Sequence, residues 1–182
     1  MKRFCFLFAV LILMMPLCSC SSLEKCLGKE IRITDKTEYK KIWTLSDLRY
    51  YEKKLFPETI ENEAVDFFEC IHVEEFLVGT DWQVLLKIHY DREQFDSEID
   101  RLSALCKDSF ICGKSDYFDC PAFASIWNAN LCFEYAVVDE QESSISYIYL
   151  QGVKKEEIKI TSLPLPKGYD WEMKSPQLAL YP

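Results

Sequence analysis

Residues 82–90 read WQVLLKIHY, and the alternation within this stretch decides the fold of the chain. Apolar side chains occupy every second position from Trp82 to Tyr90, and Gln83, Lys87 and His89 stand among the positions between them. A period of two predicts a β-strand with one buried face. We therefore start from a strand here and work outward along the chain.

The preceding stretch supplies a partner for this strand. Within Val65–Phe76, four apolar residues are expected to share one face: Val65, Phe67, Ile71 and Val73. Gly79-Thr80-Asp81 lies between the two runs and has the composition of a turn. The two runs are therefore predicted to form an antiparallel hairpin.

The residues that follow have the signature of a helix. Asp91 is expected to cap the backbone N–H of Gln94 while Gln94 reaches back, and Tyr90 is expected to pack on Phe95. An apolar stripe then recurs at helical spacing on an otherwise charged segment. The stripe consists of Phe95, Ile99, Leu102 and Cys106. This face is predicted to lie against the buried face of the sheet.

Three further runs, Tyr117–Trp127, Leu131–Asp139 and Ser144–Leu150, are rich in aromatic and branched residues and indicate an antiparallel meander. Pro121 places the first of them at an edge or shortens it. Nearer the N-terminus we expect a short strand over Ile31–Thr34.

A helix over Leu45–Leu55, with Thr44 as its cap, is expected to end before Pro57. Hairpin, helix and meander together predict an α+β fold: a single antiparallel sheet of four to six strands, with helices packed on one face.

The first twenty residues have the layout of an export signal. Lys2 and Arg3 precede an apolar run, FCFLFAVLILMMPLC, and the small-residue segment SCSS completes the signal. A permanent membrane span is the alternative, but it would need about 20 apolar residues. The run is shorter than this and contains Pro16 near its end.

Leu17-Cys18-Ser19-Cys20 resembles the lipobox of bacterial lipoproteins. The resemblance implies cleavage before Cys20, a diacylglyceryl group on its thiol, and attachment to the outer face of a membrane. Cys18 departs from the pattern, since Ala, Ser or Thr is commoner at this position. An ordinary signal peptide cut near Ser19 remains the alternative.

These features divide the chain into a signal peptide (1–19), a lipidated N-terminus and tether (20–30), a globular domain (31–160) and a Pro-rich extended tail (161–182). Without the signal, 19 basic residues face 30 acidic ones, a net charge of −11. Such a surface repels phosphate backbones, so nucleic acid is not expected as a partner.

Six cysteines follow Cys20, an even number that permits up to three disulfides in an exported chain. They are Cys26, Cys70, Cys106, Cys112, Cys120 and Cys132. Cys106 and Cys112 are the pair most easily bridged, because only a short loop separates them. Buried free thiols, which behave as small apolar side chains, are the alternative.

The patterns of common cofactor and metal sites are missing from the sequence. The five glycines are far apart, so no phosphate-binding glycine loop can be built. No C-x-x-C pair or H-E-x-x-H motif is present to hold zinc. We expect neither a cofactor nor a metal.

Two hypotheses concern groups on the surface of the sheet. One hairpin register would set Cys70 opposite His89 with His72 as a diagonal neighbour, a weak candidate for a nucleophile with its base, or for a metal site with Glu69 or Glu74. The simpler interpretation is a polar, solvated sheet face.

Aromatic residues of the meander offer a second surface. They could form an exposed stacking surface for sugars or a peptide, or else fill the core. They are Phe133, Tyr135, Tyr147 and Tyr149.

The favoured function is a membrane-anchored extracytoplasmic binding or interaction module. Its partners would be the membrane, through lipid on Cys20, and an envelope protein, peptide or glycan. The alternative is an extracytoplasmic enzyme of the hydrolase type, acting on cell-wall material or peptides.

Overall fold

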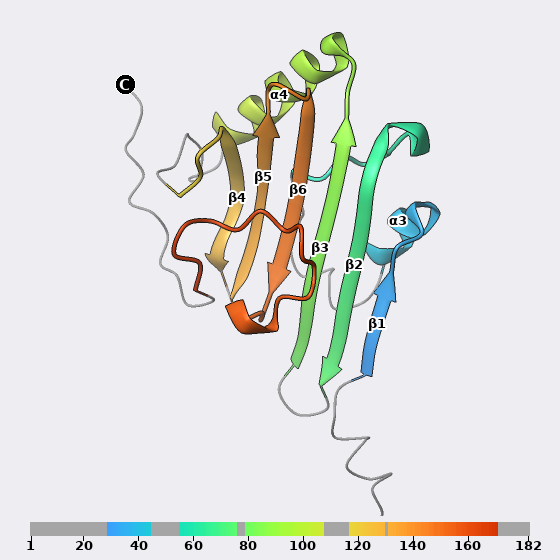
Figure 1. Cartoon of the computed structure of the whole chain (residues 1–182), viewed down its shortest axis with the longest axis vertical. Helices are drawn as coiled ribbons and strands as arrows, with labels where there is room; N and C mark the ends of the chain where they lie inside the picture. The colour runs from blue at the N-terminus through green and yellow to red at the C-terminus, as the bar shows by residue number, and fades with distance from the viewer. Residues whose placement is uncertain (1–28, 45–54, 76–78, 108–116, 130, 171–182) are drawn as a thin grey trace, which may run out of the picture.

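The computed structural model describes residues 29–44, 55–75, 79–107, 117–129 and 131–170. Within them, six strands form one antiparallel sheet in the order β1-β2-β3-β6-β5-β4 (Figure 1). The strands are β1 (Lys29–Ile33), β2 (Val65–Glu75), β3 (Gly79–His89), β4 (Ala122–Ala129), β5 (Cys132–Asp139) and β6 (Ser144–Gln151). The predicted single antiparallel sheet is confirmed, with the hairpin and meander as its two halves.

Helices are less prominent than an α+β fold implies. The described ones are η2 (Lys36–Glu38), α3 (Tyr39–Ile42), η4 (Asn62–Ala64), α4 (Arg92–Lys107) and η5 (Lys155–Glu157). Only α4 exceeds four residues. The helix predicted over Leu45–Leu55 falls almost entirely outside the described residues.

The start of α4 follows from its sequence. The backbone N–H of Gln94 donates to Asp91 Oδ1 at 2.8 Å, as the capping pattern predicted. Phe95 and Leu102 of the apolar stripe are buried, and Ile99 is partly buried. This stripe attaches the helix to the sheet.

The hairpin is confirmed, but its predicted turn is wrong. Gly79 already pairs with Glu75 and Asp81 with Val73, so Gly79-Thr80-Asp81 belongs to β3 and the connection falls at residues 76–78. Extending the ladder gives backbone groups of both strands a partner, and this long-range pairing outweighs the local turn preference of Gly and Asp.

A bulge at the start of β2 changes which face each residue occupies. Val65 pairs with Ile88 and Phe67 with Lys87, which leaves Asp66 as the extra residue. Val65 therefore packs in one core, whereas Phe67 lies on the opposite side of the sheet with Ile71. The prediction that Val65 shares a face with Phe67 and Ile71 is wrong for this reason.

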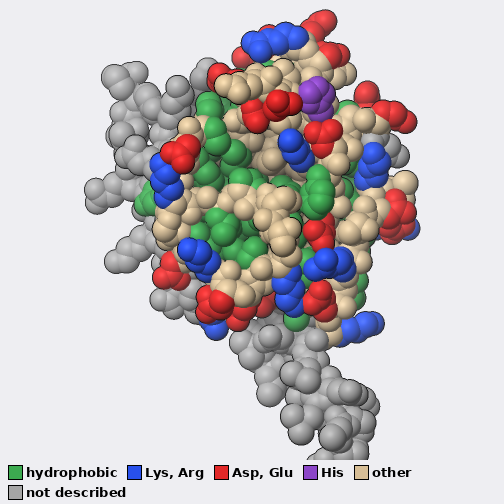
Figure 2. Space-filling model, viewed as in Figure 1, with side chains coloured by type: hydrophobic (Ala, Val, Ile, Leu, Met, Phe, Trp, Pro, Cys, Tyr) green, Lys and Arg blue, Asp and Glu red, His purple; other side chains and the backbone are tan. Residues whose placement is uncertain are grey.

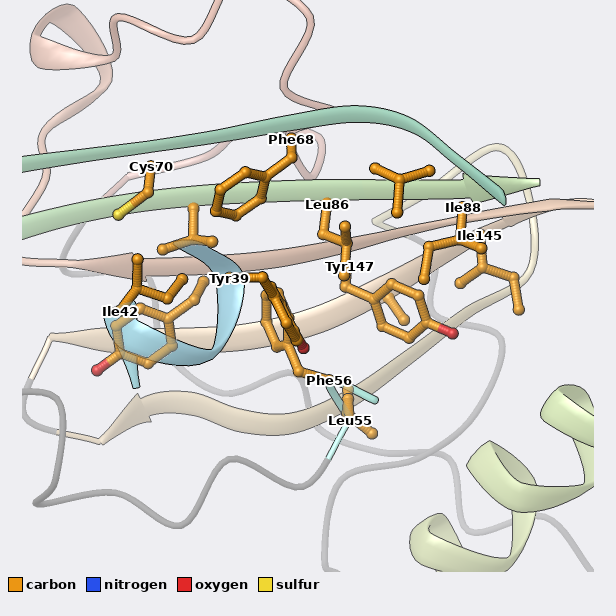
Figure 3. Close-up of a cluster of buried hydrophobic side chains, with 14 of the residues drawn as sticks. Tyr39, Ile42, Leu55, Phe56, Phe68, Cys70, Leu86, Ile88, Ile145 and Tyr147 are labelled. Atoms are coloured by element: carbon orange, nitrogen blue, oxygen red, sulfur yellow. The ribbon is translucent and has the colours of Figure 1, made fainter. Parts of the chain in front are cut away.

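The first core lies between one face of the sheet and α3, α4 and residues 55–64 (Figure 3). Trp82, Val84, Leu86 and Ile88 contribute to it from β3, and each is at most 3% exposed. These are the alternating positions of the strand from which the sequence analysis started. The predicted buried face of β3 is therefore confirmed.

The second core covers the other face, which the alternation alone would leave in solvent. Figure 1 shows residues 153–170 crossing the front of the sheet. Ile160, Leu163 and Tyr169 of this segment are buried against strand residues. Those strand residues are Ile71, Leu85, Phe133, Tyr135, Ile148 and Leu150. The first ten residues of the segment predicted as an extended tail thus contribute to this core.

Gln83 fastens residues 153–170 to the sheet. Its Nε2 donates to the carbonyl of Glu157 at 2.9 Å, and its Oε1 accepts from the N–H of Lys159 at 2.8 Å. Gln83 is 2% exposed, so both bonds form away from solvent. A residue predicted to face water instead holds a covering segment.

We expect Gln83→Leu to lower the free energy of unfolding by about 1–2 kcal/mol, because the part-buried carbonyl of Glu157 and N–H of Lys159 lose their partner. Chemical denaturation measures the change, and limited proteolysis should cut residues 153–170 faster. Glu156→Gln, at an exposed position of the same segment, is the matched control and should change neither quantity. Unaltered stability and proteolysis in Gln83→Leu would contradict this role.

A polar network crosses the first core. Tyr147 donates from its hydroxyl to Glu98 Oε1 at 2.5 Å and lies 2.8 Å from the hydroxyl of Tyr90. Arg101 donates from Nε to Glu98 Oε2 at 2.7 Å and from Nη2 to the carbonyl of Leu55 at 2.5 Å. The network joins α4 to β6 and to the start of segment 55–64.

Glu134 holds the same segment from the sheet. Its side chain is fully buried, its Oε1 accepts from the N–H of Leu55 at 3.1 Å, and its Oε2 accepts from the hydroxyl of Ser125. Both backbone groups of Leu55 are thus bound by side chains, Glu134 on β5 and Arg101 on α4.

Candidate functional site

The observed register separates the three residues of the Cys-His hypothesis. Cys70 pairs with Val84 and His72 with Trp82, whereas His89 pairs with Ser144 at the far end of β3. The predicted pairing of Cys70 with His89 is wrong, because β3 already pairs with β2 at Gly79, and this shifts the register of the whole ladder. The sheet therefore does not bring these three side chains together.

The environments of Cys70 and His72 are those of core residues. Cys70 is fully buried, and burial raises the pKa of its thiol to about 12. His72 stacks on Trp82, with 3.9 Å between ring centroids and 9° between ring planes. A neutral thiol of this kind is a poor nucleophile. His89, by contrast, is exposed.

Carboxylates do not complete a metal site around these residues. Glu69 forms an ion pair with Arg32, with 3.1 Å between Oε1 and Nη1. The side chain of Glu74 lies outside the described residues. Among the described side chains, no group of three His, Cys, Asp or Glu residues could hold a metal ion.

The aromatic residues of the meander are fully buried. Phe133 and Tyr135 belong to the second core, and Tyr147 and Tyr149 to the first. The alternative of an exposed stacking surface is therefore wrong, because coverage of both sheet faces leaves these rings inside.

The cysteines give partial information on disulfides. Cys70, Cys120 and Cys132 form no disulfide with one another or with another described cysteine. Cys112, Cys26 and the side chain of Cys106 lie outside the described residues, so the predicted Cys106–Cys112 bridge stays a prediction. Cys20 and the lipobox also lie outside them.

A groove of about 660 Å³ lies on the second face of the sheet, beside residues 153–170. Its apolar lining comes from Phe67, Leu85, Pro121, Val137 and Pro164. Figure 2 shows hydrophobic side chains in the middle of this face and charged ones around them. Phe67, 37% exposed, is the most exposed large apolar side chain of the described core strands.

The sheet register explains where the groove lies. Phe67, Lys87, Ser146 and Val137 follow one another across β2, β3, β6 and β5 as direct neighbours. Ser146 has a small side chain, and so has Ser144 one row further on. Residues 162 and 164 of the covering segment also line the groove. The groove forms because the small side chains of Ser144 and Ser146 lie among larger neighbours.

Ser144 places a polar side chain among the residues that line the groove. The residue is 1% exposed and lines the groove, and its Oγ has no hydrogen-bond partner in the described part of the chain. A buried hydroxyl without a partner is costly and uncommon.

Sequence reasoning missed this groove. The available signal was Ser144 and Ser146 in a strand whose next residues on the same face, Ile148 and Leu150, are apolar. Small polar residues at positions of a buried face indicate a gap in the packing. The signal identifies the strand but not the other residues that line the groove.

Within the described ranges, no helix has the length and apolar content that a membrane crossing requires. Comparisons with protein-family models, curated proteins and solved structures found no match for this chain.

Proposed function

We propose that the protein is a lipid-anchored, extracytoplasmic binding protein whose ligand occupies the groove on the second face of the sheet. The resemblance of residues 17–20 to a lipobox supports attachment to the membrane through lipid. The groove, with its apolar lining and the carboxylates at one end, is the observation that supports binding.

The dimensions and lining of the groove suit a ligand. Its volume of about 660 Å³ falls within the range of about 300–1,000 Å³ that is usual for ligand sites. An apolar lining with a few polar groups is also usual, since the polar groups orient what the apolar surface binds. A sheet buried on both faces provides a rigid base for such a site.

The hydrolase alternative has less support. Its thiol candidate, Cys70, lies in the first core opposite Val84, and His89 lies further along β3 at its C-terminal end. The carboxylate of Glu134 is fully buried, where it binds Leu55 and Ser125. Binding in the groove requires none of these groups to react.

Photo-crosslinking in intact membranes tests the proposal. Benzoylphenylalanine replaces Phe67 in the full chain, and adducts are compared with and without the substitution Ser146→Trp, which fills the groove. We expect a defined adduct at position 67 that Ser146→Trp reduces at least tenfold, because the indole occupies the ligand's volume.

Benzoylphenylalanine at Glu58, an exposed position of segment 55–64, is the matched control and should not give this adduct. Adducts that are the same at both positions, or that persist in Ser146→Trp, would contradict binding in the groove.

The membrane extracts also test the lipid anchor. The intact mass should correspond to a chain that begins at Cys20 and carries a diacylglyceryl group. An unmodified chain that begins elsewhere would contradict lipidation.

A further inference from the structure

The groove has an acidic end. Asp139 and Glu140, at the turn from β5 to β6, line it on one side, and Asp119 lies in the loop before β4. Asp119 is neutralised by an ion pair with Lys167. Asp139 and Glu140 form no ion pair with any residue that the structure describes. Among the described residues, these two carboxylates therefore have no counter-ion at this end of the groove.

The opposite end is apolar and close to neutral. Phe67 and Leu85 lie there, and the single lysine of the groove, Lys87, is 3.9 Å from a carboxylate oxygen of Asp66. The charge of the groove is thus distributed unevenly, with apolar surface over β2 and β3 and negative charge beside β5.

Cys120 lies beside the acidic end of the groove. It lines the groove, and the pKa of its thiol is raised, first by partial burial and then by the charges of Asp119 and Asp139. Both carboxylates disfavour an additional negative charge at this position. A cation placed there would be stabilised by the same field.

From this layout, and on the basis of the proposed function, we infer that the groove binds an extended peptide segment that carries apolar side chains followed by basic ones. The apolar side chains contact Phe67 and Leu85. The basic side chains reach Asp139 and Glu140.

The length of the groove is compatible with this occupant. The row from Phe67 on β2 to Val137 on β5 crosses three spacings between strands, roughly 14 Å in all. An extended chain advances about 3.4 Å per residue and presents alternate side chains on one side, so four residues cover this distance. Apolar and basic side chains four positions apart therefore match the two ends.

Synthetic peptides test this inference on the full chain in a non-ionic detergent. The probe is the blocked heptapeptide Leu-Ser-Leu-Ser-Lys-Ser-Lys, with glutamine and glutamate in place of lysine in two control peptides. Crosslinking by benzoylphenylalanine at position 67 measures binding. We expect the lysine peptide to be crosslinked at least tenfold more strongly than the glutamate peptide, and less strongly as salt is raised.

Neutralising the acidic end should weaken binding of the lysine peptide only. In Asp139→Asn/Glu140→Gln we expect a loss of about three- to tenfold, since each exposed ion pair contributes about 0.2–1 kcal/mol. Asn retains an oxygen to accept the N–H groups of Gln141 and Glu142, which Asp139 Oδ1 binds at 3.1 Å. Glu156→Gln removes one charge at an exposed position of η5 and should not alter binding.

The remaining outcomes separate this inference from the proposed function. Equal crosslinking of all three peptides, abolished by Ser146→Trp, would overturn the basic class of ligand and leave the groove as a binding site. Crosslinking that is insensitive to salt and to Asp139→Asn/Glu140→Gln would also overturn the basic class of ligand. If no peptide is crosslinked, the peptide inference is overturned, while the adducts formed in intact membranes still decide whether the groove binds another ligand.

Discussion

Replacement of Arg101 by Met should lower the free energy of unfolding by about 2–3 kcal/mol. The substitution leaves the carboxylate of Glu98, whose side chain is 12% exposed, without its cation, and it removes the donor to the carbonyl of Leu55. Loss of one partner from a buried pair costs about 3–5 kcal/mol. The side chain of Arg101 is 35% exposed, so water compensates for part of this cost.

Urea denaturation measures the free energy of unfolding of Arg101→Met and of the matched control Arg92→Met. Arg92 forms an ion pair with Asp96 at 3.1 Å on the same helix, but the two side chains are 71% and 58% exposed. An exposed pair contributes at most about 1 kcal/mol, so Arg92→Met should be close to neutral. Equal effects of the two substitutions would show that the network in the first core does not hold α4 and Leu55 in place.

The second large effect is a loss of stability in alkali. Burial raises the pKa of Cys70 from 9.0 to about 12, so the folded protein holds this proton more tightly than the unfolded chain. The stability that this proton contributes is complete below pH 9 and is lost as the pH rises toward 12. The expected slope for one such group is up to about 1.4 kcal/mol per pH unit.

Buried tyrosines extend the same trend above pH 10. Burial is the first cause of a raised pKa at five of them: Tyr39, Tyr90, Tyr135, Tyr147 and Tyr169. Each folded tyrosine retains its proton at a pH where the unfolded one ionises, so the sign is the same as for Cys70. We therefore expect the decline to become steeper above pH 10.

Denaturation at several pH values from below pH 8 up to pH 10, under reducing conditions, isolates the contribution of Cys70. The variant Cys70→Ala should show a shallower decline between pH 9 and 10 than the wild type. Below pH 8 the thiol is neutral in both states, so the difference between the two proteins should be constant there and serves as the internal control. Parallel curves from pH 8 to 10 would contradict the raised pKa.

The two cores make different contributions to the proposed site. The first core, with its buried polar network, connects α3, α4 and residues 55–64 to the sheet. The second core is completed by residues 153–170, and the groove lies between this segment and the small side chains of Ser144 and Ser146. Substitutions in the first core should therefore affect stability, and those in the groove should affect binding.

Local patterns were enough to find most of the elements. The period of two in residues 82–90 identified β3 and its face in the first core, and Asp91 marked the start of α4. The meander was found from branched and aromatic residues between polar turns. These features depend on residues within one strand or one helical turn, so the sequence alone contains them.

The register of β2 with β3 and the burial of the second sheet face depend on residues far apart in the chain. The shift that separated Cys70 from His89 arises because β2 and β3 extend their ladder through Gly79 and Asp81. Gln83 and Leu85 are buried only because residues 153–170 cover their face. No local pattern contains these pairings, since each is selected by the total burial and hydrogen bonding of the assembled sheet.

By itself, the sequence determined an acidic chain with a hairpin, a capped helix and a meander, and the lipobox resemblance of residues 17–20 stays a prediction. Tertiary structure alone decided that both faces of the sheet are covered and that a groove remains on the second face. Phe67, Ser144 and Pro164 meet there because three distant segments pack around small side chains on β6. A site formed by such packing has no counterpart in any continuous stretch of the sequence.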